Sequence, residues 1–292
     1  MTTPPKPIRI VQVSDTHLSR HRGHFNFNFA VFAELMRQDP PDLIVHSGDL
    51  SLNGADDESD LAFAKAWHDL LPAPWIAIPG NHDIGEAPPF SRLKQPLDAE
   101  RIARFERIVG PRWWTRDIGG WRLIGLDSSL MASGLADEAR QLAFLDDALQ
   151  NRPGNRKLLF VHMPPYEDDP DDPAFTTHSV PHPARAGLLD RCVAQGVRAI
   201  GCAHLHVHRA LSHRGLQIVW APTTAFVNIA NRIAAGYGFP RAGYIEWTLD
   251  GDALSYRLVE PAGMITQDVG RWNEDVGSTI TMPPLPGITW PV

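Results

Sequence analysis

The stretch IRIVQVSDTH, residues 8–17, joins a short apolar segment to Asp15 and His17, two side chains that can bind a metal. The length of the segment and its isoleucine and valine content predict a buried β-strand that ends just before Asp15. In open α/β sheets, functional side chains gather beyond the carboxyl ends of the strands. This first strand therefore predicts a site at one edge of a sheet.

Two later segments repeat the same arrangement. PDLIVHSGD (41–49) ends at Asp49, and PAPWIAIPGNHD (72–83) contains Asn81 just after its apolar part. Segments with helical spacing lie between the predicted strands, and the polar clusters recur about every 30 residues, which is the length of one βαβ unit. With right-handed crossovers, we expect all three clusters on one rim of one sheet.

The rest of the chain continues as a mixture of helices and strands. Residues 113–129 are typical of a hairpin with Gly119–Gly120 at the turn. A later helix is expected to bury a stripe formed by Leu142, Leu145 and Leu149. The predicted helices are 27–38, 58–71, 98–109, 137–150 and 184–195. Further strands are predicted at 157–165, 197–202, 216–222, 243–249 and 253–260, the last three of them antiparallel.

The segment IGCAHLHVHRA, residues 200–210, carries histidines at every second position, His204, His206 and His208. If the segment is a strand, all three side chains point to one face. Such a pattern fits either a polar strand face on the surface or a metal site built from neutral imidazoles. The choice depends on whether partners occur elsewhere in the chain, and the three earlier strand ends supply them.

Five motifs in order follow predicted strands, and together they resemble the calcineurin-like metallophosphoesterase superfamily. The superfamily signature is DxH, GD, GNH, a lone His and GHxH. The corresponding residues are Asp15-Thr16-His17, Gly48-Asp49, Gly80-Asn81-His82, His162 and Ala203-His204-Leu205-His206. The resemblance spans roughly residues 8 to 210. Ala203 replaces the usual glycine, and we expect a small backbone adjustment that spares both histidines.

The resemblance implies an α/β fold, a four-layer α-β-β-α sandwich of two mixed sheets flanked by helices. It also implies two metal ions that share one carboxylate, Asp49. The first would be held by Asp15, His17, Asp49 and His206, and the second by Asp49, Asn81, His162 and His204. Mixed nitrogen and oxygen ligands suit Mn, Fe, Zn or Co better than a soft thiolate metal. The glycines before Asp49 and Asn81 are expected to let the backbone turn sharply.

The same resemblance implies hydrolysis of a phosphoric ester by a hydroxide that bridges the two metals and attacks phosphorus in line. His82 would contact the phosphate or help to protonate the leaving oxygen. Asp83 would orient the His82 imidazole. We therefore expect His82 and Asp83 to be catalytic.

The remaining histidines are expected to lie outside the metal site. His46 sits inside an apolar strand and fits a core histidine with both nitrogens bonded, and His68 is expected to be structural. His208 is expected beside the ligands or at the surface, because the motif needs two histidines. Loop positions are expected for His21, His24, His178 and His182.

Charge and composition exclude several functions. A formal net charge of −7 and a pI near 6.0 argue against a nucleic acid duplex as partner. No apolar run is long enough to cross a bilayer, and the first residues do not follow the plan of a secretory signal. Cys192 and Cys202 form no CxxC pair, which favours reduced thiols in the cytoplasm.

Two stretches lack regular patterning. Residues 163–183 are acidic and rich in proline, which favours a solvated loop over a lid that determines specificity. We expect a catalytic domain over residues 1–262 and a tail over 263–292 that packs on the domain or on a second subunit. Leu285 and Trp290 in this tail motivate the expectation of a homo-oligomer, a dimer or larger.

Within the superfamily, the sequences of the motifs look most like those of bacterial class III cyclic nucleotide phosphodiesterases and glycerophosphodiesterases. This resemblance implies a small-molecule phosphodiester as substrate, a 3′,5′-cyclic nucleotide or a glycerophosphodiester-like compound. A phosphomonoesterase or a nucleotide pyrophosphatase on the same site is the alternative, and a metal-free scaffold is the alternative from another class. The scaffold is disfavoured because all seven expected ligand positions are filled.

Overall fold

The computed structural model of the chain describes residues 6–87, 91, 93–150, 156–228, 238 and 240–269. The strands are β1 (Ile8–Val13), β2 (Leu43–His46), β3 (Trp75–Ala77), β4 (Trp114–Ile118), β5 (Trp121–Gly125), β6 (Arg156–Phe160), β7 (Val197–Cys202), β8 (Arg209–His213), β9 (Leu216–Trp220), β10 (Phe226–Val227), β11 (Tyr244–Asp250), β12 (Ala253–Val259) and β13 (Gln267–Asp268). The helices are α1 (Asn26–Gln38), α2 (Glu58–Asp69), α3 (Asn81–Ile84), α4 (Ala99–Ile108), α5 (Ala136–Ala148) and α6 (His182–Ala194), with a 3₁₀ turn η1 (Ser128–Leu130).

Two mixed sheets form the centre of the fold. The first has the order β12-β11-β1-β2-β3. Strands β1, β2 and β3 are parallel to one another, β11 is antiparallel to β1, and β12 is antiparallel to β11. The second has the order β4-β5-β6-β7-β9-β8, in which β5, β6, β7 and β9 are parallel and the two edge strands are antiparallel. The expected hairpin is confirmed as β4–β5. Strand β9 was expected to be antiparallel, but it pairs in parallel with β7 and antiparallel only with β8.

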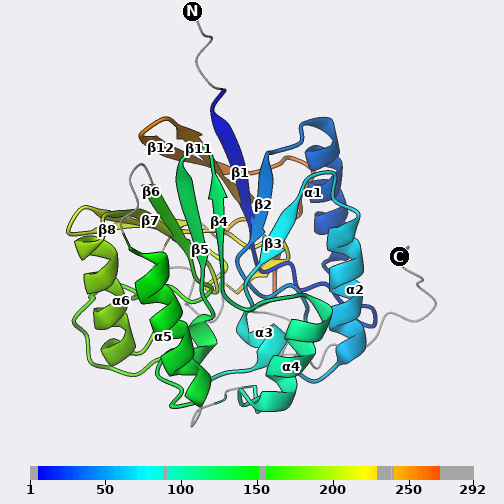
Figure 1. The fold of residues 1–292 in the computed structure, drawn as a ribbon. Helices are drawn as coiled ribbons and strands as arrows, with labels where there is room; N and C mark the ends of the chain where they lie inside the picture. The colour runs from blue at the N-terminus through cyan, green and yellow to red at the C-terminus, as the bar shows by residue number, and fades with distance from the viewer. Residues whose placement is uncertain are drawn as a thin grey trace, which may run out of the picture.

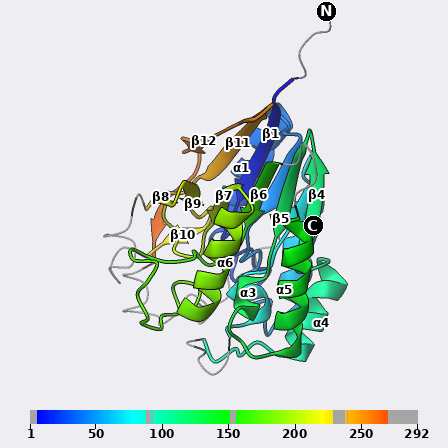
Figure 2. The same cartoon turned by 60° about the vertical axis from the view of Figure 1, so that its left-hand side comes forward.

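Three apolar clusters define the four layers. One joins α1, α2 and α4 to the first sheet through residues such as Phe32, Leu61 and Phe105. A second lies between the two sheets, and a third joins the second sheet to α5 and α6. Figure 1 shows α1 and α2 along one outer face and α5 and α6 along the other, and Figure 2 shows α5 and α6 turned toward the viewer. The predicted α-β-β-α sandwich is confirmed.

The two sheets end at a common rim. The parallel strands β1, β2 and β3 of one sheet and β5, β6 and β7 of the other run in the same general direction in Figure 1, so that their carboxyl ends lie above the short helix α3. Backbone bonds link the loops there, from Asp15 N to the Gly48 carbonyl (3.0 Å) and from Ala203 N to the His162 carbonyl (2.8 Å). This is where an α/β sheet is expected to hold its site.

One packing expectation is wrong. Leu142 is 42% exposed, whereas Leu145 and Leu149 are buried as predicted. The position on the buried face of α5 is taken by Gln141, whose side chain accepts from Asp127 N (2.8 Å) and donates to the Asp127 carbonyl (2.9 Å). A glutamine that bonds a strand end has therefore displaced the leucine from the core-facing stripe.

The segment 200–210 is not one continuous strand. Strand β7 ends at Cys202, residues 203–208 form a loop, and β8 begins at Arg209. His204 and His206 adopt left-handed backbone angles, φ 72° and 59°, so the two side chains are placed by a turning loop and not by strand alternation.

Of the tail, the structure describes residues 263–269. Strand β13 pairs in parallel with β10, so the start of the tail packs on the domain. Leu285 and Trp290 lie outside the described residues, and the oligomer contact expected there stays a prediction.

Cys192 and Cys202 are buried and unpaired. No helix in the described part of the chain is both long and apolar enough to span a bilayer.

Candidate metal centre

Six of the seven side chains that the sequence predicts as ligands meet at the common rim. Two groups of ligand atoms each lie within 4.8 Å of one another, Asp15–His17–Asp49–His206 and Asp49–His162–His204. Asp49 belongs to both, which is the expected arrangement of a bridging carboxylate. Its Oδ2 lies 3.7 Å from His17 Nε2 and 3.3 Å from His162 Nε2.

The backbone at these ligands is strained. Of the eight non-glycine residues with positive φ that the structure describes, five belong to this set: Asp15, His17, Asp49, His204 and His206, with φ between 42° and 72°. A left-handed residue other than glycine costs about 1–2 kcal/mol. Such strain gathers at functional sites and persists where the surroundings hold it, here by hydrogen bonds between the loops.

The two glycines of the motifs have different roles. Gly48 has φ +103°, which favours glycine, and a Cβ there would lie 2.4 Å from His162 Nδ1. Gly80 has an extended backbone, φ −108° and ψ −178°, so the expected need for a special turn is wrong at this position. Its Cβ would instead lie 2.1 Å from Asp49 Oδ1, so Gly80 is required for the space that it leaves to the shared carboxylate.

Three histidines of the two groups are oriented by backbone carbonyls. His162 Nδ1 lies 2.9 Å from the Ser47 carbonyl, and His204 Nε2 lies 2.9 Å from the Thr177 carbonyl. His206 Nδ1 contacts the Phe226 carbonyl in the same way. Because a carbonyl only accepts, each of these nitrogens carries the proton and the opposite nitrogen faces the cluster, as metal-binding histidines usually do.

The structure corrects the role expected for Asp83. Its carboxylate accepts from the backbone of Leu50, Ser51 and Gly80 and from the Ser51 hydroxyl (2.7–3.1 Å), so it fastens the loop after β2 to the start of α3. The ring of His82 is oriented by the Leu52 carbonyl, 2.7 Å from Nδ1. Asp83 therefore holds the loop that carries Asp49, and the expected contact with the imidazole is replaced by a backbone carbonyl.

The charges of the cluster favour a cation. Burial acts to raise the pKa of Asp49, but His162 and then His82 outweigh it and hold that pKa well below its usual range. Burial acts to lower the pKa of His162, but the charge and hydrogen bond of Asp49 raise it to about 9. A metal ion would replace the proton on His162 as the partner of Asp49.

Unsatisfied polar atoms also fit metal binding. Asp15 Oδ1 and Asn81 Oδ1 are buried without a hydrogen-bond partner. An unpaired buried polar group is destabilising unless something binds it, and oxygen and imidazole nitrogen are the ligands that divalent transition metals prefer. These residues fit a divalent metal centre, and Asn81 lines the same pocket as His204 of the second group.

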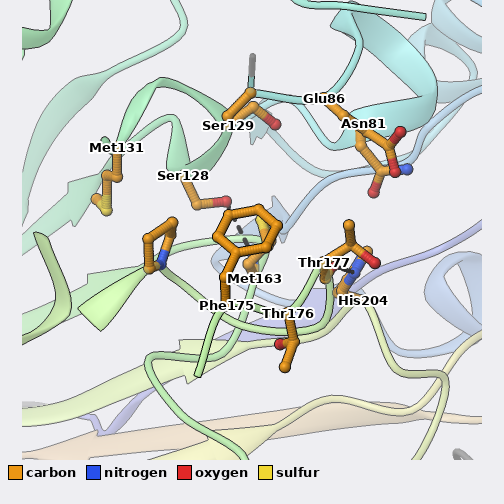
Figure 3. Close-up of a pocket in the computed structure, with 12 residues that line it drawn as sticks. Asn81, Glu86, Ser128, Ser129, Met131, Met163, Phe175, Thr176, Thr177 and His204 are labelled. Carbon is orange, nitrogen blue, oxygen red and sulfur yellow. Dashed lines mark hydrogen bonds between the residues drawn. The ribbon is translucent and has the colours of Figure 1, made fainter. Parts of the chain in front are cut away.

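A pocket opens beside the cluster. Asn81 and His204 form one side, and Phe175, Thr176 and Thr177 from the acidic loop form another (Figure 3). The loop is held by Arg209, which bonds the Glu167 carbonyl (2.8 Å) and Asp168 (2.6 Å). The favoured interpretation of residues 163–183 as only a solvated loop is therefore wrong, because part of it lines the site.

The other histidines lie outside the two ligand groups. His46 accepts from Gly48 N at Nδ1 (3.2 Å) and bonds the Thr16 hydroxyl at Nε2 (3.0 Å), which confirms a core histidine with both nitrogens bonded. His208 bonds the Trp220 carbonyl (2.9 Å) and is half-buried. His68 is fully buried on α2, where its Nδ1 donates to the Ala64 carbonyl (2.7 Å).

His68 predicts a loss of stability in acid. Burial lowers its pKa from 6.5 to about 4, so between these values the unfolded chain binds a proton that the folded chain does not. Stability therefore falls as the pH falls through this window, by about 2 kcal/mol between pH 7 and pH 5. Urea unfolding at pH 7 and pH 5 gives the free energy of unfolding at each pH. From pH 7 to pH 5 it should fall by about 2 kcal/mol more in the wild type than in His68→Phe. An equal drop in both proteins would contradict it.

Comparison with known proteins gives a sequence match over most of the chain. The family model described as Calcineurin-like phosphoesterase matches residues 8–208. A probable glycerophosphodiester phosphodiesterase, GpdQ, of Arcobacter nitrofigilis is 31% identical over 209 residues, which cover 68% of this chain and 71% of that protein. A probable cyclic nucleotide phosphodiesterase of Synechococcus is 34% identical over 167 residues, 54% of this chain and 58% of that protein.

A solved structure supports the fold. The purple acid phosphatase PPD1 from yellow lupin (Lupinus luteus) superposes with a TM-score of 0.63 at 15% identity, covering 88% of this chain and 52% of the lupin chain. The chain thus spans about half the length of this structural relative. At this identity the likeness concerns the fold alone.

Proposed function

The chain belongs to the calcineurin-like phosphoesterase family, whose members hydrolyse phosphoric esters, and we propose that it is a dinuclear metal-dependent phosphodiesterase. The proposed substrate is a small phosphodiester, a 3′,5′-cyclic nucleotide or a glycerophosphodiester-like compound. The observation that carries the proposal is the pair of ligand groups that share Asp49. The names of the two relatives above, both phosphodiesterases, favour a diester over a monoester.

We assign the seven rim residues to two transition-metal ions from Mn, Fe, Zn and Co. Asp15, His17 and His206 would hold the first with Asp49, and Asn81, His162 and His204 would hold the second with Asp49. Bound metals would supply an activated water and would offset charge on the phosphoryl oxygens. The carbonyls of Ser47, Thr177 and Phe226 keep three imidazoles in the tautomer that this binding needs.

His82 is the candidate proton donor. Its backbone N–H donates to Asp49 Oδ1 (2.8 Å), and its ring packs edge-on against His17 at 4.6 Å between centroids. With its Nδ1–H bonded to the Leu52 carbonyl, the ring is fixed so that Nε2 is the nitrogen left to contact the phosphate or the leaving oxygen. It would donate a proton from Nε2 in the imidazolium form, in which both nitrogens carry one. Asp83 acts through the loop and not on the substrate.

The test compares an aryl phosphodiester with its monoester in the presence of Mn²⁺. We expect bis(4-nitrophenyl) phosphate to be hydrolysed with higher kcat/KM than 4-nitrophenyl phosphate. His162→Ala should lower diester hydrolysis by about 100-fold or more, because it removes a ligand of the second metal. His213→Ala on β8, outside both ligand groups, is the matched control.

The outcomes separate the alternatives. A preference for the monoester would favour a phosphomonoesterase, and hydrolysis of a dinucleotide pyrophosphate alone would favour a nucleotide pyrophosphatase. A protein that binds no transition metal after purification without chelator, and that no added metal activates, would favour the scaffold. Each of these results would contradict the proposed phosphodiesterase.

A further inference from the structure

The pocket beside the metal centre has an acidic end. Glu86 lines it next to Asn81, and Figure 3 shows the two residues lying together. Glu86 is only 8% exposed. No lysine or arginine occurs among the residues that line this pocket in the described part of the chain. An additional negative charge on a substrate would therefore meet a carboxylate here.

Glu86 is held firmly in place. Its backbone N–H donates to the Gln95 carbonyl (2.8 Å), and its own carbonyl accepts from Leu97 N (2.7 Å). One carboxylate oxygen, Oε2, accepts from Leu93 N at 3.1 Å. Among the described residues the Leu93 N–H is the one hydrogen-bond donor seen on this buried carboxylate. A cation in the pocket would interact with it favourably.

A second polar group in the pocket has no partner. Ser129, in the 3₁₀ turn η1, is 1% exposed, and its hydroxyl is buried without a hydrogen-bond partner. Its neighbour Ser128 already accepts from Met163 N at 3.0 Å. Ser129 thus offers an unused hydroxyl donor in a pocket that also contains predicted ligands of the second metal, Asn81 and His204.

The remaining wall of the pocket is formed by apolar side chains, two of them methionines that can adapt their conformation. Met131, Met163 and Phe175 line the pocket, and Figure 3 shows the Phe175 ring across its middle. Methionine side chains adapt to irregular shapes. The face of an aromatic ring attracts an ammonium group. An anionic end, an aromatic face and apolar walls together match a short alcohol that carries a positively charged nitrogen.

We propose that Glu86, Ser129 and Phe175 form a subsite for one alcohol arm of the phosphodiester, and that this subsite selects an arm ending in an ammonium group. Ser129 would donate to an oxygen of the ester, while Glu86 and Phe175 would contact the cationic end. The proposal rests on the proposed phosphodiesterase function and narrows its substrate class. It disfavours esters whose arm carries a second anionic group, including pyrophosphates.

The test uses three methyl phosphodiesters that differ in the other arm. The arms are 2-(trimethylammonio)ethyl, its neutral isostere 3,3-dimethylbutyl, and the anionic 3-carboxypropyl. Because methyl is small and uncharged, differences among the three compounds report on the second arm. Each compound is measured as a competitive inhibitor of aryl phosphodiester hydrolysis by the Mn²⁺-loaded enzyme, so that binding is read out even where turnover is slow.

We expect the cationic compound to inhibit with a Ki about tenfold lower than the neutral isostere, and the anionic compound to inhibit least. Glu86→Gln keeps an oxygen that can accept from Leu93 N and should abolish the difference between the cationic and neutral compounds. Ser129→Ala should raise all three Ki values by about fivefold, because it removes a hydrogen bond common to them. Glu100→Gln, an exposed residue on α4 that pairs with Arg104, is the matched control.

The inference is overturned if the wild type does not prefer the cationic compound, if the preference survives Glu86→Gln, or if none of the three compounds competes with the aryl diester. In all these cases the aryl diester is still hydrolysed and the proposed function stands. Absence of aryl diester hydrolysis would instead refute the proposed function, and the inference would fall with it.

Discussion

Asp49→Asn should lose both metal ions and lower kcat/KM for an aryl phosphodiester by about 10³-fold or more. The carboxylate is the one side chain common to both ligand groups, and its Oδ2 lies near both His17 Nε2 and His162 Nε2. Asparagine has the same shape, but it is neutral and offers one oxygen in place of two. A 10³-fold loss corresponds to about 4 kcal/mol of transition-state stabilisation, which is in the range supplied by metal ions.

Metal content and fold have to be measured with the rate. We expect elemental analysis to show about two equivalents of transition metal in the wild type and less than one in Asp49→Asn. Circular dichroism should show the same helix and strand content in both. Asp69→Asn, an exposed carboxylate that pairs with Lys65, serves as control and should keep metal and rate. A variant that retains two metals and a rate within tenfold of wild type would contradict a shared carboxylate.

Much of this centre follows from the sequence, for a physical reason. Side chains that follow successive parallel strands must lie on one rim, so Asp15, Asp49 and Asn81 could be placed together without coordinates. The second sheet was harder, because its distance from the first is set by packing and not by spacing along the chain. There, the order of the motifs and the resemblance to the superfamily supplied what local pattern does not.

Other features had no sequence signal. The carbonyls of Ser47, Leu52 and Thr177 orient imidazoles, but every residue has a carbonyl, so nothing in the composition marks these three. Glu86 was missed because it follows a short helix and precedes an irregular stretch, where periodicity predicts nothing. Gln141 displaced Leu142 from the buried stripe because its partner, Asp127, is brought near only by the fold.

Gly48→Ala should damage the same centre without altering any ligand. A methyl group at this position would lie 2.4 Å from Nδ1 and 2.6 Å from Cγ of His162, well inside van der Waals contact. The ring would have to move away from the Ser47 carbonyl that orients it and from Asp49. We expect kcat/KM to fall by about 100-fold, and the free energy of unfolding to fall by about 2–4 kcal/mol from overpacking plus backbone strain.

Gly215→Ala separates these two causes. Gly215 also has positive φ, +85°, in the turn between β8 and β9, and a Cβ there would meet nothing within 4 Å. It should therefore reproduce the backbone strain, about 1 kcal/mol, while leaving kcat/KM and metal content unchanged. If Gly48→Ala loses no more stability and activity than Gly215→Ala, then contact with His162 is not what excludes a side chain there. A selective loss of the second metal in Gly48→Ala would instead show that the space beside His162 is part of the metal site.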